Sequence, residues 1–143
     1  MDRQIKFRGL RVDGKGWEYG DLIQYSKTEI KILDQFFREW DILEAASDVN
    51  PFTVGQFTGI IDKNGKEIYE GDICRIMMRR KYGHEKDGLS RPLGPVEFSR
   101  ISVRDESLYV FDTFNIKGTS LHYLASMELE VIGNIHEQSE VPN

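Results

Sequence analysis

Residues 56–73 read QFTGIIDKNGKEIYEGDI, and this stretch decides the fold class. Asn64-Gly65 lies between two runs rich in β-branched and aromatic residues, the strongest short-range signal of a β-hairpin. Gly71-Asp72 then opens a further strand, Ile73–Met78. Because successive side chains of a strand alternate between the two faces of a sheet, we expect one face to carry Ile73, Arg75 and Met77 and the other to carry Cys74, Ile76 and Met78.

Alternating apolar residues predict more strands on both sides of this hairpin. The predicted strands are 4–12, joined by an Asp13-Gly14 turn to a return strand through 17–23, and then 29–33, 96–98, 108–111 and 129–136. Two short helical segments are also predicted, one after an Asn50 cap and ending at Gly55, and one after a Ser120 cap. Residues 34–46 fit a helix or a strand, and the hairpin-rich surroundings favour the strand.

These elements predict a mainly β protein with two parts. An N-terminal β-hairpin region occupies 1–50, and it packs on a small SH3-like or related β-barrel at 51–143, which carries the motif TGxxDKNGKEIYEGDI. One or two short helices complete the fold. Residues 79–95 contain five Gly and Pro breakers and many charges, so we expect a long loop there.

Composition excludes several classes of protein. The chain has 143 residues and 39% hydrophobic residues, which is normal for a globular domain. The single cysteine, Cys74, excludes an internal disulfide and a cysteine-based metal site. No apolar run approaches the roughly 20 residues that span a bilayer, and residues 1–6 lack the apolar core of a secretion signal. We expect a cytoplasmic protein without membrane contact.

Charge is distributed unevenly along a chain whose net charge is −5. Between residues 75 and 91 six basic residues face two acidic ones, a local charge of +4, whereas residues 97–143 carry three basic and eight acidic residues, a local charge of −5. The basic segment could contact a phosphate backbone, although a solvated loop is the favoured interpretation. The candidate nucleic-acid contacts are Arg75, Arg79, Arg80, Lys81, Tyr82, Lys86 and Arg91.

The residues that could support catalysis or metal binding do not form a recognisable set. Four carboxylates surround the central hairpin: Asp62, Glu67, Glu70 and Asp72. Their spacing is not that of a calcium loop, so we interpret Asp62 and Asp72 as turn residues. Cys74 lies in an apolar strand, where a cysteine is usually buried and inert. The sequence therefore predicts no catalytic residue, no metal and no cofactor.

The central motif, together with VIGNIHE at 131–137, resembles the YopX family of phage and prophage proteins. The opening residues KFRG at 6–9, Trp17 and YGDL at 19–22 resemble the N-terminal hairpin of that family. The resemblance covers nearly the whole chain and is weakest at 28–48 and 79–95. It implies a small β-rich protein encoded by a phage or prophage and present in the bacterial host cell, and it supplies no catalytic residues.

Three classes of function fit these observations. We favour a non-enzymatic accessory protein that acts through protein–protein contacts with itself and with a host or phage protein. Its homo-oligomerisation is expected because a small β-rich chain with few helices leaves strand edges uncovered. The alternatives are a nucleic-acid-binding accessory factor that uses the basic segment and, less favoured, an enzyme.

Overall fold

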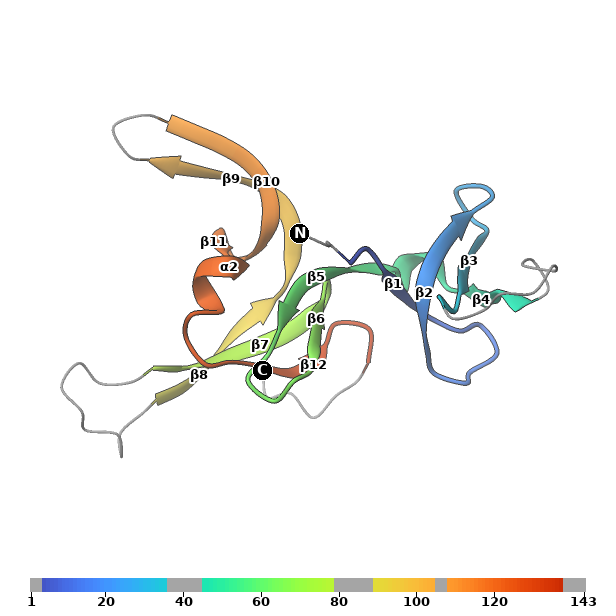
Figure 1. Cartoon of the computed structure of the whole chain (residues 1–143), viewed down its shortest axis with the longest axis horizontal. Helices are drawn as coiled ribbons and strands as arrows, with labels where there is room; N and C mark the ends of the chain where they lie inside the picture. The colour runs from blue at the N-terminus through green and yellow to red at the C-terminus, as the bar shows by residue number, and fades with distance from the viewer. Residues whose placement is uncertain (1–3, 36–44, 79–88, 105–107, 138–143) are drawn as a thin grey trace. The chain divides into compact units, whose positions relative to one another are not determined.

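The computed structural model describes residues 4–35, 45–78, 89–104 and 108–137. The chain is mainly β, as predicted, and forms two compact units, Met1–Gly59 and Ile60–Asn143. Figure 1 shows the antiparallel strands of each unit. None of the helices in the described part of the chain has the length and apolar character that crossing a bilayer requires.

The first unit is an antiparallel sheet in the order β4-β3-β2-β1-β5, and the residues after β1 bond back to β4 through an Arg11–Val49 bridge and the Val12 N–H, which donates to the Asp48 carbonyl at 3.0 Å. Its elements are β1 (Phe7–Leu10), β2 (Trp17–Gln24), β3 (Ile30–Leu33), β4 (Ser47–Val49), the 3-10 helix η1 (Pro51–Thr53) and β5 (Gly55–Ile61). Strand alternation places Ile30 and Ile32 on one face, where they form a small core with Val49. The 3-10 helix has the predicted cap, since the side-chain oxygen of Asn50 accepts a hydrogen bond from the Phe52 N–H at 3.0 Å.

The first hairpin is confirmed, but its connection is longer than the predicted two-residue Asp13-Gly14 turn. The last paired residues are Leu10 and Trp17, and the Arg11 N–H donates to the Gly16 carbonyl at 2.9 Å. The Asp13 carboxylate accepts from the Lys15 N–H and from the Arg11 guanidinium. The side chain of Asp13 therefore organises a wider loop than a type I′ turn.

The second hairpin is confirmed at Asn64-Gly65. Strand β5 runs across the boundary between the units, and its neighbour on this side is β6 (Glu67–Tyr69). Two backbone hydrogen bonds close the turn. The Asp62 N–H donates to the Lys66 carbonyl at 2.7 Å, and the Gly65 N–H donates to the Asp62 carbonyl at 3.0 Å. Gly65 has φ +83°, as the prediction requires, whereas Asn64 does not have a positive φ. The turn is thus a type I turn followed by glycine rather than type I′.

The second unit contains two further three-stranded sheets, ordered β12-β7-β8 and β11-β10-β9. Their elements are β7 (Asp72–Met78), β8 (Leu89–Pro95), β9 (Glu97–Arg104), β10 (Leu108–Ile116), β11 (Thr119–Ser120), the helix α2 (Leu121–Leu124) and β12 (Leu129–Asn134). The described strands form open sheets and no closed barrel, so the SH3-like barrel is not confirmed.

The core of the second unit confirms the predicted alternation of Cys74, Arg75 and Ile76 along β7 and shows that the Cys74–Ile76 face points inward. Cys74 is fully buried and Ile76 is 6% exposed, while Arg75 between them is partly exposed. Apolar residues from five other elements or turns complete this core: Ile68, Val96, Phe114, Ile116, Leu121, Leu124 and Leu129. The α2 helix follows Ser120, as predicted, and buries Leu121 and Leu124, although the Ser120 side chain makes no capping hydrogen bond.

The predicted loop over 79–95 is wrong at its C-terminal end, because residues 89–95 form strand β8. Among the strands that the structure describes, β8 pairs only with β7, so it is an edge of this sheet. Pro92 lies opposite Arg75 next to a register shift in the β7–β8 pairing. Proline is tolerated at sheet edges and bulges, where no ladder hydrogen bond needs its missing N–H. Residues 79–88 lie outside the described part, as do 36–44 of the ambiguous segment 34–46.

Candidate functional site

The predicted basic segment is only partly visible in the structure. Arg75 lies on β7 and Arg91 on β8, whereas Arg79, Arg80, Lys81, Tyr82 and Lys86 lie outside the described residues. The register pairs Arg91 with Ile76 and pairs Arg75 with Pro92. The two described arginines are therefore on neighbouring strands but are not opposite each other.

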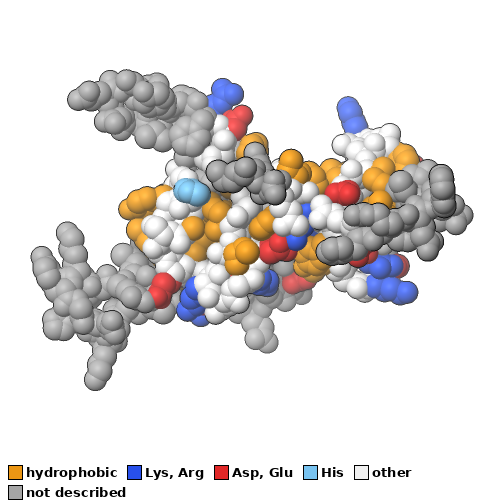
Figure 2. Space-filling model, in the orientation of Figure 1, with side chains coloured by type: hydrophobic (Ala, Val, Ile, Leu, Met, Phe, Trp, Pro, Cys, Tyr) orange, Lys and Arg blue, Asp and Glu red, His pale blue; other side chains and the backbone are white. Residues whose placement is uncertain are grey.

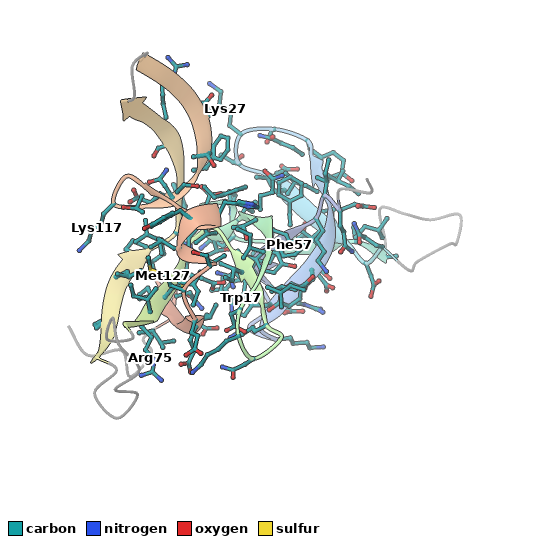
Figure 3. The ribbon with its side chains drawn as sticks, turned by 60° about the vertical axis from the view of Figure 1, so that its left-hand side comes forward. Trp17, Lys27, Phe57, Arg75, Lys117 and Met127 are labelled. Atoms are coloured by element: carbon teal, nitrogen blue, oxygen red, sulfur yellow. The ribbon has the colours of Figure 1, made fainter. Side chains whose placement is uncertain are left out.

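Arg75, which is labelled in Figure 3, lies on β7 and forms an ion pair with Glu130 of the neighbouring strand β12. Its guanidinium donates a hydrogen bond from Nε to Oε2 of Glu130 at 3.0 Å, and its Nη2 forms an ion pair with the same oxygen at 2.9 Å. The Lys63 ammonium lies 3.6 Å from the same carboxylate. The Arg75 hydrogen bond and the two positive charges lower the pKa of Glu130 below its ordinary value. A phosphate that binds Arg75 must therefore compete with Glu130.

Sequence reasoning missed Glu130 as the partner of Arg75. The two residues are directly opposite in the antiparallel β7–β12 pair. Opposite charges at such positions are a common stabilising pair in sheets. The signal was present in the sequence as a basic residue in one strand and an acidic residue in another. It becomes readable only when the pairing of the two strands, which are far apart in sequence, is known.

The carboxylates of the central motif serve the backbone, as their interpretation as turn residues predicted. Asp62 is 6% exposed, and its Oδ1 accepts from the N–H groups of Asn64 and Lys66, each at 2.9 Å. Its Oδ2 accepts from the Val131 N–H of β12 at 3.0 Å. Asp72 is 1% exposed, and its Oδ2 accepts from the Tyr69 N–H at 2.8 Å. Both carboxylates therefore stabilise turns and strand pairing.

The cysteine is not set up as a nucleophile. Burial raises the pKa of the Cys74 thiol to about 12, and the negative charges of Asp72 and Asp62 act in the same direction. A thiol with such a pKa is protonated at neutral pH, whereas a catalytic cysteine needs a lowered pKa. Within the described ranges, no group of three or more His, Cys, Asp or Glu side chains is placed to hold a metal ion.

The first unit has a polar recess of about 510 Å³ beside its first hairpin. Its charged lining residues are Arg11, Asp13, Glu18, Asp34 and Asp48. Arg11 contacts Asp13 at 2.6 Å and Glu18 at 3.4 Å, and the Ser47 hydroxyl donates to Glu18 at 2.9 Å. These contacts tie the β1–β2 loop to the start of β4. The recess is thus built from structural ion pairs and hydrogen bonds.

Comparison with known proteins agrees with the resemblance noted in the sequence. No curated protein matches the chain. The family model described as YopX protein matches residues 6–141, which include both hairpins, the Asp62 turn and strand β12. Because this match covers nearly the whole chain, the protein belongs to the YopX family.

Proposed function

We propose that this chain is a phage or prophage accessory protein that acts in the bacterial cytoplasm through protein–protein contacts and assembles as a homo-oligomer. The observation that carries the proposal is the set of open sheet edges. Each sheet ends in strands that pair with one neighbouring strand only within the described part of the chain. Four of these edges are β6, β8, β9 and β11. The outer side of β4 is partly covered by Arg11 and Val12, and backbone groups of β12 are bound by Asp62 and Lys63. An unpaired strand edge offers backbone donors and acceptors to another chain.

Exposed apolar side chains in both units support the same proposal. Phe52 is 89% exposed, and Tyr123, Ile61, Ile135 and Phe98 are each more than half exposed. Figure 2 shows apolar side chains at the surface among polar ones. Single exposed apolar residues are common on monomers, so these residues support the proposal only together with the open edges. The partners are a second copy of the chain and a host or phage protein.

Light scattering over a dilution series in the low micromolar range tests the self-association. We expect a mass that is a multiple of 16.6 kDa and that falls on dilution if the assembly is weak. A mass of 16.6 kDa at every concentration would overturn the homo-oligomer.

A second candidate function is nucleic-acid binding, which the local charge of +4 over residues 75–91 favours. The structure adds a sharper test, because Arg75 already has a carboxylate partner in Glu130. If this segment binds a phosphate backbone, Glu130→Gln should strengthen binding by removing that competitor. Fluorescence anisotropy with a labelled duplex at several salt concentrations measures this effect, since phosphate contacts weaken steeply with salt. Binding that is absent at low salt would exclude this function.

A further inference from the structure

A small apolar pocket lies in the second unit, beside β8 and β11, which are edge strands among those that the structure describes. Its volume is about 90 Å³. The lining residues come from β8, from the β10–β11 turn and from α2, and they are Pro92, Leu93, Ile116, Lys117, Thr119 and Leu124. Ile116 and Leu124 are buried, whereas Pro92, Lys117 and Thr119 are exposed. The pocket therefore has an apolar floor that belongs to the core and a rim that solvent reaches.

Lys117, at this rim, holds a backbone conformation that lysine does not favour. It lies in the turn between β10 and β11, in which Ile116 pairs with Thr119. Lys117 has φ +50° and Gly118 has φ +83°, as a type I′ turn requires. Such turns prefer asparagine, aspartate or glycine, because other side chains are strained there. Within the described residues Lys117 is the only non-glycine residue with a positive φ. Strain of this kind is often kept for a function, so the lysine side chain needs an explanation.

The Lys117 side chain, labelled in Figure 3, places a positive charge beside the pocket. A Cβ atom built at Gly94 would lie 3.2 Å from Lys117 Cε and 3.9 Å from its Nζ, so the aliphatic part of the lysine lies along the β8 backbone next to Leu93. None of the ion pairs formed within the described ranges includes Lys117. Its ammonium group is therefore available to an anion from another molecule.

We propose that this pocket binds the C-terminal residue of a partner protein, with an aliphatic side chain in the pocket and the α-carboxylate paired with the Lys117 ammonium. The proposal rests on the protein–protein contacts proposed above and specifies one of them. An engineered cavity of about 150 Å³ binds benzene, so a pocket of about 90 Å³ suits the three or four side-chain carbons of valine or leucine. The positive charge of Lys117 selects an anionic group.

A C-terminal residue meets both requirements better than an internal acidic residue does. Its carboxylate and its side chain leave the same Cα atom, so they reach the apolar floor and Lys117 together. In an extended peptide the next side chain points to the opposite face, and the one after it lies about 7 Å away. That separation exceeds the width of a pocket of about 90 Å³. Capture of a C-terminal carboxylate is also an established mode of peptide recognition.

NMR titration of the isotope-labelled full chain with three short probes tests this assignment. The probes are N-acetyl-glycyl-leucine, which ends in a free carboxylate, the corresponding C-terminal amide, and N-acetyl-glycyl-glycine, which lacks the aliphatic side chain. We expect the backbone signals of Leu93, Lys117 and Gly118 to shift. The amide should bind about 2–5-fold more weakly than the acid, the range of an exposed ion pair. Loss of the leucine side chain should weaken binding by about 10-fold or more.

Lys117→Asn removes the charge and keeps the turn, because asparagine tolerates a φ of +50°. We expect this variant to bind the acid and the amide with equal affinity and to unfold at the same temperature as the wild type or at a higher one. Lys27→Asn is the matched control, because it removes a lysine from the exposed loop between β2 and β3 of the first unit. It should keep the wild-type preference for the acid.

The outcomes separate this inference from the proposed function. A preference for the acid that Lys117→Asn abolishes and Lys27→Asn keeps supports the inference. Equal affinity of the wild type for acid and amide overturns the carboxylate contact, and the absence of shifts at the pocket overturns the site. If light scattering shows a monomer whose pocket binds the acid, self-association is wrong and this inference stands. An oligomer that does not bind the acid overturns this inference alone.

Discussion

Replacing Asp62 by alanine should strongly destabilise the second unit. The carboxylate accepts three backbone hydrogen bonds, two inside its own turn and one from Val131 in β12. Water can reach the Asn64 and Lys66 N–H groups, because both residues are exposed. The loss of these two bonds should therefore cost about 0.5–1.5 kcal/mol each. The half-buried Val131 N–H loses its Asp62 acceptor, at a cost of about 1–3 kcal/mol. The expected total is about 2–6 kcal/mol.

Asp62→Asn separates the two parts of this effect. The amide oxygen can still accept from the turn, but the amide nitrogen would face the Val131 N–H with two donors in contact. We therefore expect a loss of about 1–3 kcal/mol, all of it from the link to β12. Asp112→Asn is the control, because the Arg100–Asp112 contact is 3.4 Å long and exposed on both sides, and such pairs contribute about 0–1 kcal/mol.

Urea unfolding followed by far-ultraviolet circular dichroism measures these free energies. Tryptophan fluorescence is unsuitable, because both tryptophans, Trp17 and Trp40, precede the second unit. The result that refutes the reasoning is an Asp62→Ala variant that is no less stable than Asp112→Asn. Equal losses for Asp62→Ala and Asp62→Asn would instead show that the two hydrogen bonds within the turn contribute nothing.

Three further predictions follow from single residues. Gly65→Val should lower the free energy of unfolding by about 1 kcal/mol or more, because a β-branched residue resists the φ of +83°. Gly65→Asn should cost less, because asparagine tolerates this conformation. Equal melting temperatures for the two variants would contradict this prediction. Cys74 should react with a thiol reagent at pH 8 only when urea unfolds the protein. The pKa of the folded Cys74 thiol is raised to about 12. The stability that this shift contributes should therefore be fully present below about pH 8.5, the pKa of an unperturbed thiol, and should be lost as the pH rises toward 12. A Cys74→Ala variant whose stability has the same pH dependence as the wild type would argue against this prediction. Arg75→Ala should raise the lowered pKa of Glu130 toward its ordinary value. An NMR titration that finds the Glu130 pKa unchanged in this variant would show that Arg75 is not the main cause of the lowering.

The hairpins could be predicted from the sequence because their determinants are local. Alternation along the strand placed Cys74 and Ile76 on one face of β7, which the structure buries, and Asn64-Gly65 located the second turn. The failure at β8 has a physical cause. Pro92 and Gly94 usually interrupt strands, but at the edge of a sheet beside a register shift they do not. Edge position depends on which strands pair, and pairing is not visible in a local pattern.

The candidate site was less predictable than the fold for the same reason. The charge of residues 75–91 could be counted, but the ion pair of Arg75 with Glu130 depends on the pairing of β7 with β12. The third hydrogen bond of Asp62 depends on the same strand. Local reasoning therefore recognised Asp62 as a turn residue and missed its link to Val131, which connects residues distant in sequence.

A repeated sequence pattern shows how far local reasoning extends. Residues 13–22 resemble residues 64–73, since each has a turn glycine, a strand with an aromatic residue and then Gly-Asp followed by an aliphatic residue. This similarity is more typical of convergence on one hairpin solution than of a duplication. In the structure Gly71 lies in the turn before β7, whereas Gly20 lies inside β2, opposite Phe7. A Cβ atom at Gly20 would lie 1.9 Å from the Leu33 carbonyl oxygen, so close approach of β3 requires glycine there. The same residue type thus meets two different physical demands.

The residues of the central motif make contacts that stabilise the fold, so the functional contacts of the chain are expected elsewhere. Gly65 provides the turn conformation, and the carboxylates of Asp62 and Asp72 are bound to backbone N–H groups. A carboxylate with its oxygens occupied in this way is poorly placed to bind a ligand without breaking the turn. The segment that most clearly identifies the family is therefore a structural signature. The contacts that distinguish this chain from others of similar fold should then be made outside the motif, and the open edge of β9 with the exposed Phe98 is such a place.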